Sequence, residues 1–430
     1  MGSWRRRDTG SVTQAIDAHP LIPRFAQPAV DAALTDTRVV TINGARQVGK
    51  STLAARIVST MDRRALTLDD PAVLAAARAD PVGFVDHEGL LLIDEIQRCP
   101  ELLLAIKADV DRRTEPGRYL LTGSAQILTV PRLADSLAGR MEIVELWPLS
   151  QGELTGRRER FVADLLAGGE ELRQSSDLAK ADYLDLAVRG GFPEAVRRVN
   201  SPRRGRWFES YLTTLVQRDI ADLVDIERPR DLTRLLRLLA ARTAGLERIE
   251  GLARDAHLPP STLRRYLALL ETAFFLCRIP AWSPSRTTRV VHASKMFIVD
   301  SGLAAHLLGA TAARLSRPGQ DAGPVMETFV TMELRRQLGW STERATLHHF
   351  RTRDGAEVDA VLETPDGRVA GVEVKAGATV RAEDFRGLRR LRAAAGEAFV
   401  AGVVLHTGQH PLPFGDGLWA VPISPLWQGS

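Results

Sequence analysis

The chain carries, at residues 44–51, the sequence Gly44-Ala45-Arg46-Gln47-Val48-Gly49-Lys50-Ser51. The apolar run 39–42 precedes it, so a glycine-containing loop links a buried strand to a helix that begins near Lys50. Glycines at both ends of such a loop let the backbone N–H groups point inward at an anion. The alternative, a glycine turn kept for steric reasons, is disfavoured by the strand–loop–helix context. The segment predicts a phosphate-binding loop for a nucleoside triphosphate.

Short apolar runs recur between helical stretches after this loop. That rhythm predicts an α/β fold with a parallel sheet wound by helices. The runs lie at residues 66–68, 90–93, 119–122 and 143–146.

Two carboxylates follow the second of these runs. Asp94 is placed to hold Mg²⁺ together with Ser51, and Glu95 to orient or deprotonate the attacking water. An exposed acidic strand end is the alternative, which the intact phosphate loop upstream disfavours. The residues expected to bind ATP are Gly44, Ala45, Arg46, Gln47, Val48, Gly49, Lys50, Ser51, Thr52 and Asp94.

The third run ends in Gly123-Ser124, where the Ser124 hydroxyl is expected to sense the γ-phosphate. With these motifs, residues 20–150 resemble AAA+ ATPases of the bacterial branch that carry G-x-R-Q-x-G-K-[ST], D-E-x-Q and L-x-G-S. The segment 136–140 resembles the S-L-x-G-R segment of that branch. Arg140 is therefore the expected arginine finger for a neighbour's γ-phosphate, which implies a ring or another homo-oligomer.

Arg140 has a simpler alternative role, as a loop arginine paired with Glu142 or Glu145. Arg132 and Arg218 are rival candidates for the finger.

The composition indicates a globular chain of several domains. It has 430 residues, 44% of them hydrophobic, and a formal net charge of +4. The basic charge is almost all arginine, and its clusters suit a polyanion partner, although solvated surface explains any single cluster. Lysine is scarce, so its positions are informative: Lys50, Lys107, Lys180, Lys295 and Lys375.

Cysteine usage and hydropathy bear on the compartment. Cys99 and Cys277 lie far apart, without metal-type spacing or a disulfide framework. No apolar stretch is long enough to span a bilayer. We expect a cytoplasmic protein without a membrane partner.

The organisation expected from the sequence has five parts. An N-terminal arm and an AAA+ core are followed by a helical lid or linker, a winged-helix domain and an α/β domain resembling restriction endonucleases. Their bounds are 1–35, 36–150, 151–205, 206–315 and 316–425.

Residues 249–279 have the spacing of a helix-turn-helix, with a turn at 257–260. Thr262, Arg264 and Arg265 are expected on the outward face of the second helix, where they meet phosphates or base edges of DNA. Residues 274–289 would form the wing. Winged helices also dock proteins, so this alternative stays open.

In the C-terminal domain, residues 356–364 and 368–375 are expected to form a hairpin around a three-residue loop. Its register places Val358 with Val374 on an apolar face and Asp359 beside Glu373 on the other. Like charges directly across a ladder repel, which favours a divalent cation between them.

Glu327, on an expected amphipathic helix at 325–338, would complete this metal shell. Lys375 would activate a water or neutralise a phosphate. The set Glu327, Asp359, Glu373 and Lys375 resembles the E…D…E-x-K pattern of the PD-(D/E)xK superfamily, with Val358 where many members have proline. The resemblance implies Mg²⁺ or Mn²⁺; an exposed polar strand face is the alternative.

The whole chain, including the stretch K-M-F-I-V-D-S-G-L at 295–303, resembles prokaryotic AAA+ proteins fused to a C-terminal domain of unknown function. The leading hypothesis is a Mg²⁺-dependent ATP hydrolase that binds DNA and couples ATP turnover to a metal-dependent nuclease-like domain, in repair or defence. The rival is an ATP-switched signalling or scaffold protein whose C-terminal domain docks a protein without cutting.

Overall fold

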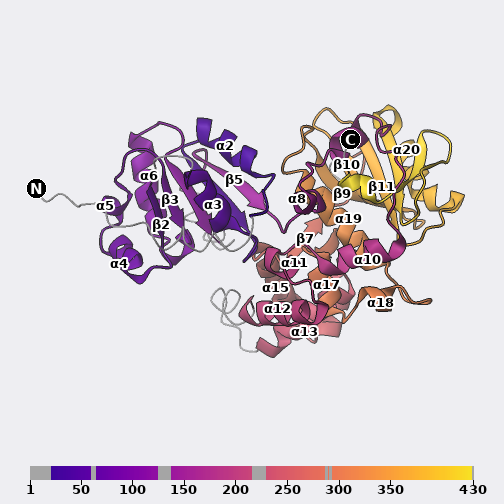
Figure 1. The fold of residues 1–430 in the computed structure, drawn as a ribbon, viewed down its shortest axis with the longest axis horizontal. Helices are drawn as coiled ribbons and strands as arrows, with labels where there is room; N and C mark the ends of the chain where they lie inside the picture. Colours follow the sequence, from indigo (N-terminus) through magenta and orange to yellow (C-terminus); the bar gives the residue numbers. More distant parts are fainter. Residues whose placement is uncertain are drawn as a thin grey trace, which may run out of the picture.

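The computed structural model describes residues 21–59, 64–123, 137–215, 229–285, 289 and 293–428. The first part is a parallel sheet of order β2-β3-β4-β1-β5 (Figure 1). This confirms the expected parallel α/β core. Its strands are β1 (Val39–Gly44), β2 (Arg64–Thr67), β3 (Leu91–Asp94), β4 (Tyr119–Gly123) and β5 (Met141–Leu146).

Successive residues of a strand point to opposite faces of the sheet, and both faces of this sheet are apolar. Helices therefore cover both faces. Val40 and Ile42 of β1 pack with α2 and α3, whereas Val39 lies in the second cluster with α6. The helices of this core are α2 (Gln27–Asp36), α3 (Lys50–Ser59), α4 (Pro71–Ala79), α5 (Pro81–Val85), η1 (Ile96–Arg98) and α6 (Leu102–Arg112).

The segment expected to be a lid or linker is helical. Of its helices, α9 packs against β11 (Val369–Lys375), β12 (Phe399–His406) and α19 (Gly323–Gln337). Helix α10 packs against α17 (Ser301–Leu307), α18 (Ala312–Leu315) and α19. The segment is therefore built into the later part of the chain. Its helices are α8 (Gln151–Thr155), α9 (Phe161–Leu166), α10 (Lys180–Arg189), α11 (Pro193–Val196) and α12 (Ser201–Thr214).

The middle module runs helix, strand, helix, helix, strand, strand, and its strands form an antiparallel sheet of order β6-β8-β7. Two short helices follow. The elements are α13 (Pro229–Ala241), β6 (Gly245–Leu246), α14 (Ile249–Ala256), α15 (Pro260–Thr272), β7 (Leu276–Ile279), β8 (Lys295–Ile298), α17 (Ser301–Leu307) and α18 (Ala312–Leu315).

The expected wing at 274–289 does not project freely where it is described. Ala281 forms a bridge with His349, and Trp282 N–H donates to the His349 carbonyl at 2.6 Å. Arg289 forms an ion pair with Glu363. The loop after β7 therefore lies against the edge of the C-terminal sheet.

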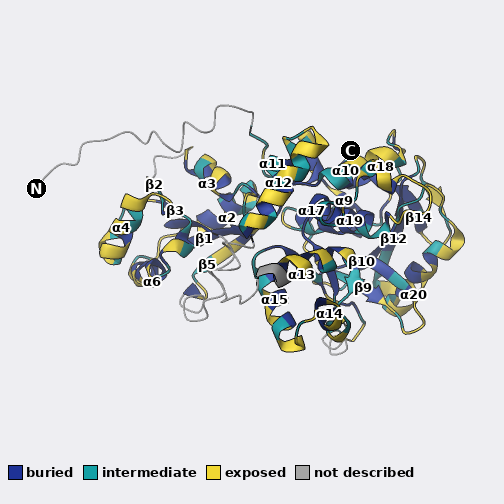
Figure 2. Ribbon diagram, turned by 90° about the horizontal axis from the view of Figure 1, so that it is seen from below, coloured by how far each residue is buried: buried dark blue, intermediate teal, exposed yellow. Residues whose placement is uncertain are grey.

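The C-terminal part is a sheet of order β13-β14-β12-β11-β10-β9 with α19 on one face and α20 on the other. Figure 2 shows α19 coloured as buried over most of its length, whereas α20 also carries exposed residues. The elements are α19 (Gly323–Gln337), β9 (Thr346–Arg351), β10 (Glu357–Glu363), β11 (Val369–Lys375), η5 (Ala382–Phe385), α20 (Arg386–Ala395), η6 (Gly396–Ala398), β12 (Phe399–His406), β13 (Leu412–Pro413), β14 (Leu418–Pro422) and η7 (Ser424–Leu426).

The expected hairpin register holds near its loop and is wrong further away. Thr364 N–H donates to the Arg368 carbonyl at 3.0 Å, and Ala360 pairs with Val372. The pairing of β10 with β9 shifts between Val358 and Val361, so Val358 packs with Val361 in the α20-side cluster instead of facing Val374. The ladder between β10 and β11 ends at the pair Ala360 and Val372, so Asp359 is not part of it.

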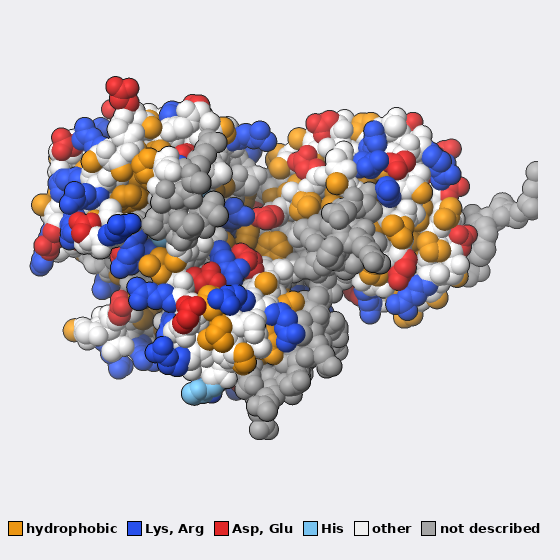
Figure 3. Space-filling view, turned by 180° about the vertical axis from the view of Figure 1, so that it is seen from behind, with side chains coloured by type: hydrophobic (Ala, Val, Ile, Leu, Met, Phe, Trp, Pro, Cys, Tyr) orange, Lys and Arg blue, Asp and Glu red, His pale blue; other side chains and the backbone are white. Residues whose placement is uncertain are grey.

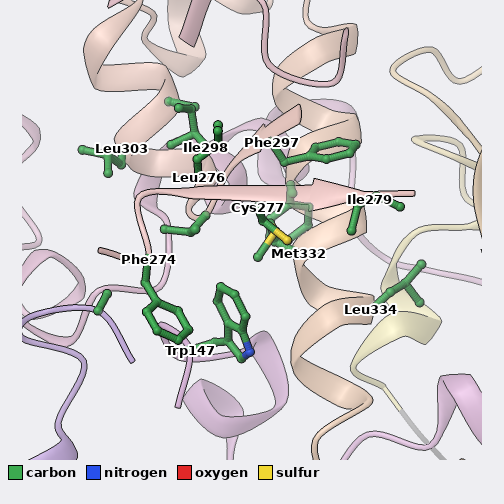
Figure 4. Packing of buried hydrophobic residues seen from close by; sticks show 14 of the residues in the cluster. Trp147, Phe274, Leu276, Cys277, Ile279, Phe297, Ile298, Leu303, Met332 and Leu334 are labelled. Atoms are coloured by element: carbon green, nitrogen blue, oxygen red, sulfur yellow. The ribbon is translucent and has the colours of Figure 1, made fainter. Parts of the chain in front are cut away.

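The parts of the chain share one large core. The Trp147 ring, in the linker after β5, lies 5.1 Å from that of Phe274 at the end of α15 (Figure 4). Arg335 of α19 stacks over Trp147 at 5.3 Å and pairs with Glu145 at 2.8 Å. The ATPase core thus contacts both later modules at this point.

Two sequence expectations concern the chain as a whole. Cys99 and Cys277 are free cysteines, and both are buried. In the described part of the chain, no helix has the length and apolar character needed to cross a bilayer.

Candidate nucleotide site and C-terminal carboxylate cluster

The phosphate loop runs from the end of β1 to the start of α3, which begins at Lys50 as expected. At Gly44 a Cβ atom would lie 2.1 Å from the carbonyl oxygen of Leu146 in β5, so only glycine fits there. Lys50 is buried, and its Nζ donates to the carbonyls of Gly44 at 3.0 Å and Ala45 at 2.8 Å. The ammonium is held beneath the loop, in reach of a bound phosphate.

Asp94, at the end of β3, is held by hydroxyl groups. Ser51 Oγ donates to Asp94 Oδ1 at 2.8 Å, and Thr122 at the end of β4 also donates to this carboxylate. Ser51 and Asp94, expected together at a Mg²⁺ ion, therefore do meet. The sequence analysis did not identify Thr122 at this site. Thr122 reaches Asp94 because β4 pairs with β3 in the sheet, and the sequence does not show this pairing.

Glu95 has a left-handed backbone, with φ of 58°, which is costly for a residue with a side chain. Its N–H lies 3.4 Å from Thr122 Oγ1, and its carboxylate accepts from the Gln97 amide. Burial raises the pKa of Glu95, and repulsion from Asp94 adds to this. A carboxylate with a raised pKa is a better base for a water molecule.

A cavity of about 990 Å³ opens beside the loop, large enough for a nucleotide. Glu95 and the loop residues 46–52 line it. Basic side chains also line it, Arg56 from α3 and four from other segments: Arg24, Arg78, Arg98 and Arg197. Such a concentration of guanidinium groups suits a polyphosphate.

Arg24 was not identified from the sequence, yet it contacts the phosphate loop directly. It donates to the carbonyls of Val48 and Trp147, at 2.6 Å each, and to Glu153 at 2.9 Å. Arg197, at the end of α11, was missed as well. Neither arginine belongs to a motif at a fixed spacing from the phosphate loop. The sequence around them therefore does not indicate that they lie at the cavity.

The expected arginine finger lies away from the cavity of its own chain. Arg140 pairs with Asp111, and the alternative partner Glu145 pairs with Arg335 instead. Ser124 and the rival arginines Arg132 and Arg218 lie outside the described residues.

In the middle module, Leu263, Leu267 and Leu270 are buried along α15, as the helix-turn-helix spacing predicts. Arg264 and Arg265 are exposed, and Thr262 is half-buried. Arg264 has a distant ion pair, at 3.7 Å, with Glu250 of α14. On the face in Figure 3, Lys and Arg side chains lie among acidic ones over the lower lobe.

In the C-terminal domain, the structure brings together the carboxylates expected at a metal ion, with a lysine between two of them. Lys295 Nζ, from β8 of the middle module, lies 2.6 Å from Glu327 Oε1 and 2.8 Å from Asp359 Oδ1. Lys375 Nζ lies 2.8 Å from Glu373 Oε1. Lys295 stood out in the sequence as a scarce residue, but its place in this cluster was missed.

Asp359 is not aligned beside Glu373 in the ladder. Its Oδ2 accepts a hydrogen bond of 2.9 Å from the backbone N–H of Val374, the residue after Glu373. In the described residues, no group of three or more Asp, Glu, His or Cys side chains is arranged to hold a metal ion. The donor set with Lys295 in place does not fit the expected Mg²⁺ or Mn²⁺ ion.

The electrostatics of this cluster follow from burial of several charges together. Burial and the Asp359 charge raise the pKa of Glu373 to about 8 and that of Glu327 well above its ordinary value. The pKa of Lys295 is raised because the attraction of Asp359 and Glu327 outweighs burial. The ammonium therefore stays charged between its two carboxylates.

Comparisons with known proteins divide the chain in a similar way. Residues 36–155 match an AAA domain, 180–314 a domain of unknown function (DUF8612), and 322–426 another domain of unknown function (DUF4143). An uncharacterized protein of Mycobacterium tuberculosis is 30% identical over 401 residues, which span 93% of this chain and 83% of the relative. An uncharacterized Mycobacterium bovis protein gives the same values.

A solved structure, a Walker-type ATPase of Pyrococcus abyssi, is 16% identical with a TM-score of 0.40. The match covers 68% of this chain and 99% of that one.

Proposed function

This chain belongs to the same family as the two mycobacterial proteins and has an AAA domain at residues 36–155, and from this premise we propose that it is an ATP-driven protein that binds DNA. The observation that carries the ATPase part is the contact of Ser51 with Asp94 at 2.8 Å, beside Lys50 and Glu95. Lys50, Ser51 and Glu95 line the same cavity as the rest of the phosphate loop.

In the proposed reaction, Lys50 binds the β- and γ-phosphates and the loop N–H groups orient them. Ser51 and Asp94 would hold Mg²⁺, which would supply positive charge to offset that of the phosphate oxygens. Glu95 orients a water molecule toward the γ-phosphorus and accepts its proton. Its left-handed backbone turns the carboxylate out of the strand direction, and Gln97 restrains it.

The arginines of the cavity divide into two proposed roles. Arg197 lies in the cavity of its own chain and would stabilise the transferred phosphoryl group there. Arg140 lies on the surface near Asp111, which supports supply to a neighbouring subunit in a homo-oligomer. Ser124 is kept as the proposed sensor of the γ-phosphate.

DNA binding is proposed for the middle module as a winged helix. The order of its helices and its β6-β8-β7 sheet support this, and Arg264 and Arg265 are exposed on α15, where Thr262 is half-buried. The loop after β7 lies against the C-terminal sheet, so α15 would make the main contact.

Two candidate roles remain for the C-terminal domain. A PD-(D/E)xK-like nuclease is supported by the meeting of Glu327, Asp359, Glu373 and Lys375 next to a sheet with a helix on each face. The position of Lys295 favours the second candidate, an ATP-switched scaffold whose C-terminal domain docks a partner without cleavage. A cleavage assay with plasmid and single-stranded DNA, in the presence of ATP and Mg²⁺ or Mn²⁺, distinguishes the two candidates. The nuclease predicts cleavage that the control variant Asp359→Ala loses, and the scaffold predicts no cleavage.

The ATPase proposal is tested by two variants that differ in the step they remove. We expect Lys50→Ala to abolish binding of a fluorescent ATP analogue, whereas Glu95→Gln keeps binding and loses phosphate release by about 10²–10⁴-fold. Lys180→Met, a lysine change far from the cavity, serves as the matched control. Folded wild-type protein that does not bind ATP would refute the proposal.

A further inference from the structure

The side chain of Lys295 lies in the middle of the C-terminal carboxylates although it comes from another module. It is 3% exposed and in hydrogen-bond contact with both Glu327 and Asp359. The second oxygen of Asp359 accepts from the Val374 N–H. Both oxygens of Asp359 are therefore engaged by groups of the protein.

A divalent cation needs several oxygens that point at one place and positions left for water or substrate. The ammonium already takes the place between Glu327 and Asp359, at 2.6 Å and 2.8 Å. A second cation in contact with the same oxygens would meet the positive charge of Lys295 at short range. The ammonium and a divalent ion therefore exclude each other.

The backbone of Lys295 is fixed on both sides. In the middle sheet it pairs with Leu246 of β6 and with Ile279 of β7. Two further contacts tie the same module to the C-terminal sheet, the bridge of Ala281 to His349 and the ion pair of Arg289 with Glu363. Rotation of the lysine out of the cluster would leave two buried carboxylates without a counter-ion, which is costly.

We propose that the Lys295 ammonium occupies the place in this cluster where a divalent ion would bind. Its ion pairs with Glu327 and Asp359 hold the middle sheet against the C-terminal domain. A metal site forms only when Lys295 is replaced. The proposal concerns the contact between the middle module and the C-terminal domain, and it does not depend on ATP hydrolysis.

The test measures Mn²⁺ binding to the nucleotide-free, full-length protein by electron paramagnetic resonance. The proteins are wild type, Glu373→Gln, Lys295→Met and the double variant Lys295→Met/Asp359→Asn, with Lys180→Met as the control for a lost lysine elsewhere. Any binding near Ser51 and Asp94 is common to all of them and cancels in the comparison.

We expect wild type, Glu373→Gln and Lys180→Met to bind the same amount of Mn²⁺. Lys295→Met should bind one additional ion per chain, which the double variant loses. Mn²⁺ should also raise the midpoint of thermal unfolding of Lys295→Met, by about 2–5 °C, and leave that of wild type unchanged.

Two results would overturn the proposal. One is a Mn²⁺ ion in wild type that Glu373→Gln loses, because the cluster would then accept a metal beside Lys295. The other is a folded Lys295→Met protein that gains no ion. If Lys295→Met does not fold, the comparison of wild type with Glu373→Gln still decides.

Discussion

Arg24 donates a hydrogen bond from Nη1 to the backbone carbonyl of Val48, at 2.6 Å, inside the phosphate loop. The same guanidinium binds the carbonyl of Trp147 and the carboxylate of Glu153, which is buried. Glu153 belongs to α8, where the neighbouring Gln151 N–H donates to Glu333 of α19 at 3.1 Å. The phosphate loop is thus connected through one arginine and one short helix to the C-terminal domain.

Replacement of Arg24 by alanine tests this connection. It leaves the Glu153 carboxylate buried without its cation, and we expect a loss of about 3–5 kcal/mol in the free energy of unfolding. We also expect weaker ATP binding, because the Val48 carbonyl loses its donor. Denaturant unfolding and nucleotide titration measure the two effects.

The variant Arg24→Ala/Glu153→Gln is the control, since it removes the unpaired charge as well. It should recover much of the stability and little of the ATP affinity. Full affinity for ATP in Arg24→Ala would contradict the role assigned to the Val48 contact.

Glu159 provides a prediction on pH. Burial and the Glu333 charge raise its pKa to about 7, and its Oε1 accepts from the Gly152 N–H at 2.8 Å. A carboxyl with a raised folded-state pKa binds its proton more tightly in the folded state. The stabilising contribution of Glu159 to the free energy of unfolding is therefore complete below the unfolded-state pKa, near 4.5. It is lost as the pH rises through the folded-state pKa of about 7.

The neutral variant Glu159→Gln removes this dependence. We expect it to exceed wild type in stability at pH 8, by about 2 kcal/mol, and to lose that advantage at pH 4.5. Chemical denaturation at a series of pH values measures the difference. Parallel pH profiles for the two proteins would show that Glu159 is ionised when folded at neutral pH.

Mixing experiments distinguish the two arginines near ATP. We expect Arg140→Ala and Arg197→Ala each to lower ATP turnover by about 10²-fold or more. If Arg140 acts on a neighbouring subunit, mixing Arg140→Ala with Lys50→Ala restores turnover, because one chain supplies the loop and the other the arginine. Arg197→Ala mixed with Lys50→Ala should stay inactive, and restoration there would assign Arg197 to the neighbour.

DNA binding by α15 predicts a particular salt dependence. Arg264→Glu/Arg265→Glu should weaken duplex binding and lower the slope of log affinity against log salt by about 0.9 for each lost phosphate contact. Arg112→Glu/Arg353→Glu, which replaces two exposed arginines in the ATPase core and the C-terminal domain, is the control with the same change in charge. Equal loss in the control would point to net charge instead of a site on α15.

Features determined by neighbouring residues could be predicted from the sequence. The strand–loop–helix around Lys50, the carboxylates at the end of β3 and the start of the hairpin at Thr364 all depend on short spacings that backbone geometry makes regular. Further along β10 the prediction was wrong, because the bulge between Val358 and Val361 puts the Val358 side chain on the opposite face of the sheet from the one expected, and no sequence signal marks it.

Only the tertiary structure decided which distant residues meet. Thr122 reaches Asp94 because β4 lies beside β3, and Arg24 contacts Val48 and Trp147, which are 24 and 123 residues away along the chain. Lys295 is 64 residues from Asp359 along the chain, and the docking of two sheets brings them to 2.8 Å. Periodicity and spacing describe neighbours along a strand or helix, whereas such contacts depend on how whole elements pack. The sequence by itself therefore determined the nucleotide loop and its carboxylates, and the packing of the modules determined the partners of Arg24 and Lys295.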